Sequence, residues 1–143
     1  MEPPMDDAHR LEIRVYYEDT DFSGVVYHAS HLRFMERGRT EFLRRLGLDQ
    51  ATLFAEGLAF AVRSLAIDYL APARMDDLLV VETKIAAAGG ASLDMSQRIM
   101  RGGATLAEAA VKVTCLRGGK PTRLPPVLRQ NPPGNAPLRV TRR

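Results

Sequence analysis

A chain of 143 residues is long enough for one domain with a sizeable core, because folding at this length removes about 70% of the unfolded chain's surface from water. The composition, 45% hydrophobic and 26% charged without tryptophan, excludes disordered and fibrous proteins. The net charge of +3 is concentrated in residues 118–143, which hold six Lys or Arg and no Asp or Glu, so removing these six leaves −3 for the rest. A broad nucleic-acid-binding face on the body is therefore excluded.

The sequence is typical of a protein of a reducing compartment, and we expect it in the cytoplasm. The acidic start has no apolar run behind it, so we expect no signal peptide, and no stretch approaches the roughly 20 apolar residues of a membrane span. Cys115 is the single cysteine and we interpret it as a buried core thiol. The basic C-terminal segment could still meet phosphates or an anionic membrane surface, which leaves peripheral membrane association open.

The first elements are a strand, an acidic loop and a long helix. Apolar residues alternate from Leu11 to Tyr17, which predicts a strand with one buried face. The loop that follows carries Asp19 and Asp21 and turns at Gly24. Helical spacing then runs from about Ser30 to Leu46, with Gly47 as the expected stop. The expected buried stripe of this helix contains Leu32, Met35, Arg39, Phe42, Leu43 and Leu46.

The second half reads as one short helix and four strands. Asp49 is a natural N-cap for a helix ending near Glu56. Diglycines at 89–90 and 102–103 indicate hairpin turns. Alternating or extended patterns predict strands at 60–70, 78–86, 92–101 and 104–116.

This inventory predicts an α+β fold in which the last three strands form an antiparallel meander and the long helix covers the apolar face of the sheet. One helix cannot cover both faces or both edges of such a sheet. We therefore expect an obligate homo-oligomer.

Asp21 is the first candidate catalytic residue. A carboxylate can act as general base or nucleophile, and the free amides at the start of the following helix, near His28, can hold a developing oxyanion. The alternative is a loop aspartate that caps its own turn through a side-chain oxygen.

Four other side chains carry weaker signals. His28 and His31 have i, i+3 spacing, but no further ligand or metal motif accompanies them, so we expect no metal. His28 could line a pocket or be a surface residue. Glu36 lies near the apolar stripe, where it could contact substrate or pair with an arginine, and Tyr27 could form a pocket wall or belong to the core.

The stretch Tyr17-Glu-Asp-Thr-Asp-Phe-Ser-Gly-Val-Val-Tyr-His28, with Phe34-Met-Glu-Arg-Gly-Arg39, resembles the hotdog-fold thioesterases of the 4-hydroxybenzoyl-CoA thioesterase type. Within them it is most similar to the acyl-CoA thioesterases encoded with the Tol-Pal cell-envelope system of Gram-negative bacteria. The similarity continues through Phe60-Ala-Val-Arg63 and residues 69–77 to residues 92–99.

The resemblance implies a long central helix wrapped by a curved five-stranded antiparallel sheet, paired into dimers and usually tetramers. We divide the chain into a flexible leader (1–9), a single hotdog thioesterase domain (10–117) and a basic, proline-rich tail (118–143), which departs from the family and whose end we expect to be disordered. A cofactor is not implied.

The resemblance also implies hydrolysis of an acyl-CoA thioester, and we expect short-chain acyl groups. The catalytic aspartate falls on Asp21 and the helix-start amide on His28. We assign substrate contacts to Gly24, Val26, Tyr27, Glu36 and Arg63; Arg74 and Arg98 are further candidates for the CoA phosphates.

Two other functions stay open. One is a hotdog hydratase or dehydratase, in which His28 and Asp21 would work together. The other is a module that binds acyl-carrier protein or envelope-system partners with little turnover.

Overall fold

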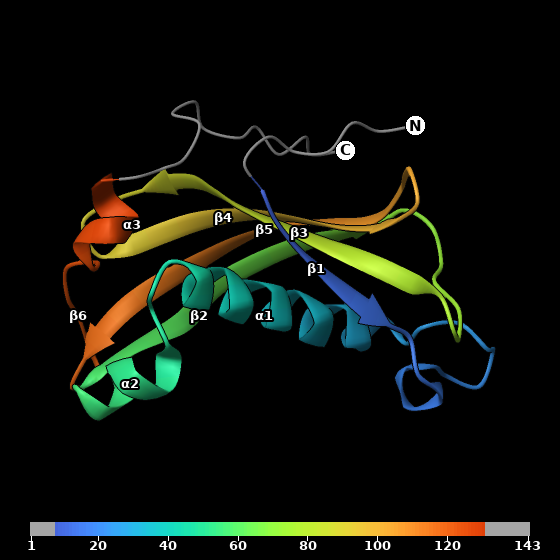
Figure 1. Cartoon of the computed structure of the whole chain (residues 1–143), viewed down its shortest axis with the longest axis horizontal. Coiled ribbons are helices and arrows are strands. Elements are labelled where there is room, and N and C mark those ends of the chain that lie inside the picture. The colour runs from blue at the N-terminus through green and yellow to red at the C-terminus, as the bar shows by residue number, and fades with distance from the viewer. Residues whose placement is uncertain (1–7, 131–143) are drawn as a thin grey trace.

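The computed structural model describes residues 8–130, which form a curved antiparallel sheet with a long helix on its concave face (Figure 1). The helices are α1 (His28–Arg45), α2 (Gln50–Ala55) and α3 (Pro126–Gln130). The strands are β1 (His9–Arg14), β2 (Leu58–Tyr69), β3 (Leu78–Ala88), β4 (Ser92–Arg101), β5 (Ala104–Arg117) and the short β6 (Lys120–Pro121). Within residues 8–130 there is no helix with the length and apolar character needed to cross a bilayer.

The sheet follows the order β1-β3-β4-β5-β2, with β6 beside β5. The predicted meander is β3-β4-β5, and its second hairpin turns at Gly102, where φ is +59°. The α+β class and the curved antiparallel sheet around a central helix are confirmed, and the short β6 adds a sixth strand to the five that were expected. The two outer strands of this path are β1 and the 12-residue β2.

The helix α1 packs on the sheet through a face rotated from the predicted stripe. The buried residues of this helix are Ser30, His31, Phe34, Met35, Gly38, Phe42 and Leu43. Leu32 and Arg39, which were expected near the stripe, are only half-buried. The hydrophobic pattern did not predict the centre of the buried face of α1, because His31 and Gly38 lie there and are not counted as hydrophobic residues. At Gly38 an added Cβ would lie 2.6 Å from Cγ1 of Val81, so the missing side chain lets the helix approach the sheet closely.

Part of the segment expected as a tail belongs to the packed body. β6 pairs with the end of β5, and the Leu124 amide donates to the Gly90 carbonyl (2.8 Å). Leu124 and Leu128 are buried in the hydrophobic core. The packed body therefore extends to residue 130, 13 residues past the boundary we drew at 117. The leader up to residue 7 and the disorder expected at the end of the tail lie outside the described residues.

Candidate active site

The loop before α1 is a tight hairpin held by backbone hydrogen bonds. Thr20 and Val26 form a β-bridge, and the Asp21 amide donates to the Val25 carbonyl (2.9 Å). Gly24 closes the turn with a φ of +86°, a conformation that glycine adopts without steric cost, and its amide donates to the Asp21 carbonyl (3.0 Å). Asp21 therefore lies on a short loop that leads directly into the helix.

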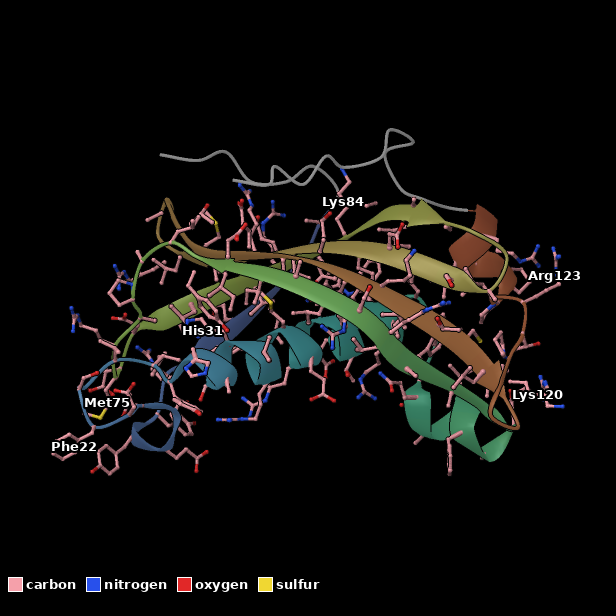
Figure 2. The ribbon with its side chains drawn as sticks, turned by 180° about the vertical axis from the view of Figure 1, so that it is seen from behind. Phe22, His31, Met75, Lys84, Lys120 and Arg123 are labelled. Carbon is pink, nitrogen blue, oxygen red and sulfur yellow. The ribbon has the colours of Figure 1, made fainter. Side chains whose placement is uncertain are left out.

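A second set of contacts anchors this hairpin to the chain before β3. The Val26 amide donates to the Ala73 carbonyl (2.7 Å), and Val25 forms a β-bridge with Arg74. Residues 25–26 therefore pair with Thr20 and Asp21 within the hairpin and also with the segment at residues 73–74, which holds the loop in place. Figure 2 shows Phe22 and Met75 at this end of the molecule, and both side chains are exposed.

The two aspartates of the loop have different environments. Asp19 is buried, and its carboxylate accepts hydrogen bonds from the Tyr16 amide (2.8 Å) and from Arg33 (3.1 Å). Asp21 is exposed, and its Oδ1 accepts from the hydroxyl (2.6 Å) and the amide (2.8 Å) of Ser23. Asp19 therefore holds the loop together, whereas Asp21 is accessible to a ligand.

Asp21 is an anion at neutral pH. The hydrogen bond from the Ser23 hydroxyl, followed by that from the Ser23 amide, lowers the pKa of this carboxyl below its usual value. These bonds are the ones expected of an aspartate that caps its own turn, so Oδ1 has the capping role considered in the sequence analysis. Both Ser23 bonds end on Oδ1, however, and the residue is exposed, so Oδ2 can accept a proton or attack a carbon.

The start of α1 offers amides without acceptors. Helix geometry leaves the first amides of any helix without an intrahelical partner, and the N-cap residue Tyr27 makes no side-chain capping bond here. The Ser30 amide is satisfied by the Tyr27 carbonyl (2.8 Å). The amides of His28 and Ala29 remain directed out of the helix, where the macrodipole favours negative charge.

The remaining predicted contact residues have three kinds of environment. The Tyr27 ring is exposed and lies 4.4 Å, between centroids, from the exposed His28 ring. Val26 is buried in the core, so only its backbone could meet a ligand. Glu36 lines a cavity of about 80 Å³ between α1 and β2, together with Arg39 and Phe60.

The three arginines proposed for CoA are separated by the fold. Arg63 is exposed at an irregularity in β2, where the pairing with β5 shifts register between Val62 and Ser64. Arg74 is exposed on the segment that bridges to the loop. Arg98 is ion-paired with Glu82 (2.8 Å) and its side chain is only 13% exposed, so it is engaged within the sheet and is a poor candidate for a phosphate ligand.

Two side chains at the helix start escaped the sequence-based assignment of the site. Tyr69, at the end of β2, donates its hydroxyl hydrogen to the His28 carbonyl (2.8 Å). His31, which the spacing placed beside His28, is instead buried, and Figure 2 shows it at the beginning of the helix on the side of the sheet. No local pattern marks Tyr69, since it lies 41 residues from its partner. Among the described residues, no three His, Cys, Asp or Glu gather into a group that could hold a metal ion.

An exposed carboxylate on a loop that leads into an uncapped helix start suits acyl transfer, and comparison with known proteins agrees. Residues 15–131 match the family model described as the thioesterase-like superfamily. The chain belongs to this superfamily. The hotdog resemblance read from the loop motif is thereby confirmed.

Individual relatives are similar over most of their length. The acyl-CoA thioesterase YbgC of Haemophilus influenzae is 51% identical over 117 residues, covering 81% of this chain and 86% of the relative. A probable thioesterase from Bartonella henselae is 46% identical with a TM-score of 0.79, covering 82% of this chain and 99% of that structure. A 1,4-dihydroxy-2-naphthoyl-CoA thioesterase from Synechocystis is 26% identical with a TM-score of 0.79, covering 84% of this chain and 91% of that structure.

Proposed function

We propose that this chain hydrolyses the thioester of short-chain acyl-CoA to a free acid and CoA. The observation that carries the proposal is the exposed, anionic Asp21 on a loop that leads into unpaired amides at the start of α1. The chain's similarity to acyl-CoA thioesterases over most of its length supports the same reaction.

In the proposed mechanism the thioester carbonyl oxygen accepts a hydrogen bond from the His28 amide. Asp21 then either attacks the carbonyl carbon or removes a proton from an attacking water. Negative charge develops on the carbonyl oxygen, where the helix dipole and the amide stabilise it. The C–S bond breaks as the carbonyl re-forms, and CoA leaves as a thiolate that needs little acid assistance. If Asp21 is the nucleophile, water hydrolyses the resulting acyl-aspartyl anhydride.

The small cavity between α1 and β2 supports a short acyl group. Its volume is about 80 Å³, and it combines the apolar Phe60 and Val62 with the polar Glu36 and Arg39. Burial lowers the pKa of the Arg39 guanidinium, which donates to Oε1 of Gln97 (3.0 Å). An acyl group in this cavity would therefore contact both apolar and polar side chains.

A second copy of the chain would complete the site. β2 is an outer strand of the sheet, and exposed apolar side chains lie along it and its end, Val62 at 49%, Tyr69 at 44% and Leu70 at 43%. An exposed strand of this length invites pairing with another strand. We propose a homodimer through β2, which can associate further into a tetramer, with the acyl-CoA bound near the contact between subunits.

Other parts of the proposal concern the cellular setting. We place the protein in the cytoplasm, where acyl-CoA is available. Acyl-carrier protein carries its acyl group as a thioester of the same kind, so it is a possible alternative donor. The link to the Tol-Pal system is supported only by the resemblance of the loop motif, and peripheral membrane association only by the basic C-terminal residues.

Thiol release tests the proposal directly. The wild type should release CoA from short-chain acyl-CoA faster than from long or aromatic ones, and Asp21→Asn should lower kcat by about 10²–10⁴, the usual contribution of base catalysis. Asp49→Asn is the matched control. Its carboxylate also accepts from a neighbouring hydroxyl and amide, those of Thr52, but it lies at α2.

The outcomes separate the candidate functions. Equal activity of wild type and Asp21→Asn would remove Asp21 from the chemistry. A wild type that is inactive on every acyl-CoA but retains acyl-carrier protein would instead support a binding module. Trapping an acyl-Asp21 anhydride in a single turnover would identify Asp21 as nucleophile.

A further inference from the structure

The Ala29 amide has no role in the proposed mechanism, although it is as free as that of His28. Both belong to the first turn of α1, and helix geometry gives neither an intrahelical acceptor. The next amide, that of Ser30, already donates to the Tyr27 carbonyl. Among the described residues, the helix start therefore presents two adjacent donors without an acceptor, enough for a two-donor oxyanion site.

The carbonyl between these two amides is held by side chains from two elements. The Tyr69 hydroxyl, from the end of β2, donates to the His28 oxygen at 2.8 Å, and Nδ1 of His31 lies 3.2 Å from the same oxygen. The His31 and Tyr69 rings contact each other edge to face, with centroids 5.1 Å apart and planes at 80°. The two groups thus form one unit around the His28 carbonyl.

The state of His31 is consistent with this contact. Its side chain is 3% exposed, and burial lowers the pKa of the imidazole, so the ring is neutral near pH 7. Because the carbonyl can only accept, a hydrogen bond requires the proton on Nδ1. Within residues 8–130, Nε2 has no hydrogen-bond partner, so the contact of the ring with the His28 carbonyl is made through Nδ1.

Holding the His28 oxygen also fixes the direction of the Ala29 N–H. The peptide unit is planar, and its C=O and N–H point in opposite directions. Since the carbonyl points along α1 toward Tyr69 and His31, the Ala29 amide must point out of the helix start. A tilt of this peptide would turn the amide away from the position of the oxyanion.

We propose that Tyr69 and His31 are positioning residues that orient the Ala29 amide as a second oxyanion donor beside that of His28. The proposal rests on the proposed thioester hydrolysis. Tyr69 lies on β2, the strand we expect to pair with a second copy of the chain. Assembly through β2 would therefore fix Tyr69, and through it the geometry of the oxyanion site.

Tyr69→Phe is the sharpest test, because it removes only the hydroxyl and keeps the ring against His31. We expect kcat for a short-chain acyl-CoA to fall about tenfold, a part of what the loss of a whole oxyanion donor costs. KM should stay within about twofold, since the amide acts mainly on the transition state. The melting temperature and the oligomeric state should match the wild type.

Tyr16→Phe is the matched control, because Tyr16 is an exposed tyrosine that comes before the acidic loop in the chain. It should leave kcat unchanged. Unchanged kcat in Tyr69→Phe, or a loss explained by a lower melting temperature or a different oligomer, would overturn the positioning role. If the wild type hydrolyses and Asp21→Asn does not, such a result leaves the proposed function intact; a wild type without thiol release overturns both.

Discussion

The starts of α1 and α2 both lie near an aspartate, but their backbone amides are used differently. At α2 the N-cap Asp49 accepts hydrogen bonds from the amide (3.1 Å) and the hydroxyl (2.8 Å) of Thr52. At the longer α1 the N-cap is Tyr27, which makes no side-chain capping bond. The aspartate near this start, Asp21, binds Ser23 within its own loop instead.

The difference in capping suggests that the start of α2 contributes to stability and that the start of α1 serves the reaction. A capped helix start has used its amides and gains stability from them. An uncapped one keeps its amides and its partial positive charge for a ligand. Because both aspartates carry a pKa lowered chiefly by a neighbouring hydroxyl, charge state alone does not distinguish them. The two are distinguished by the uncapped helix start that follows the Asp21 loop.

The two helices also differ in how much of their surface is buried. α1 packs against β1, β3 and β4 with seven buried residues, whereas α2 buries only Leu53 and lies beside β2 (Figure 1). The open helix start is thus carried by the helix that is most firmly held. A rigid support keeps the amides in place, as an oxyanion site requires.

Giving α1 the cap that α2 has should produce the largest effect. Tyr27→Asp places a carboxylate where it can accept from the amide of Ala29 or Ser30 and repel a developing oxyanion. We expect kcat for thiol release to fall about a hundredfold, while the melting temperature stays the same or rises. Tyr27→Phe, which cannot cap, serves as the control. Full turnover by Tyr27→Asp would show that the helix start takes no part in the reaction.

A second variant tests the close packing of α1 against the sheet. Gly38→Ala would bring a Cβ to 2.6 Å from Val81 and 3.0 Å from Thr83, so helix or sheet must shift. We expect the free energy of unfolding, measured by chemical denaturation, to fall by about 1–3 kcal/mol. At Gly89 the nearest atom to an added Cβ is 3.6 Å away, so Gly89→Ala should change stability by less than about 0.5 kcal/mol. Equal effects at the two positions would contradict close packing at Gly38.

The smallest effect concerns pH. Burial is the first cause of the lowered pKa of His31 and of His9, so the folded protein binds these protons more weakly than the unfolded chain. The resulting stability is complete above the unfolded value of 6.5 and is lost as the pH falls below it. The carboxyls with lowered pKa, which start from 3.8, act only in a more acidic range.

We therefore expect the free energy of unfolding to decrease from pH 7.5 to pH 5.5. The decrease should be smaller in His31→Phe, which keeps an aromatic ring beside Tyr69 but cannot titrate. Denaturant titrations at the two pH values measure both changes. An identical pH dependence in the variant would mean that His31 does not contribute.

Local patterns in the sequence were enough to predict most of the elements. The helix stop at Gly47 and the capped short helix at Asp49 are confirmed, as are the strands of the meander within a few residues. Each depends on periodicity, on a turn residue or on a cap, which act between neighbours in the chain. The same local signals gave the acidic loop leading into a helix, and with it Asp21 and His28.

The tertiary structure decided what those signals leave open. Asp19 and Asp21 are two residues apart in the same loop, yet only the packing of Arg33 and the Tyr16 amide makes one structural and leaves the other exposed. Leu124 and Leu128 gave too short an apolar pattern among the prolines to predict their burial. Tyr69 reaches the His28 carbonyl only because of where β2 ends beside α1. Contacts of this kind depend on how distant segments pack against one another, which no local pattern records.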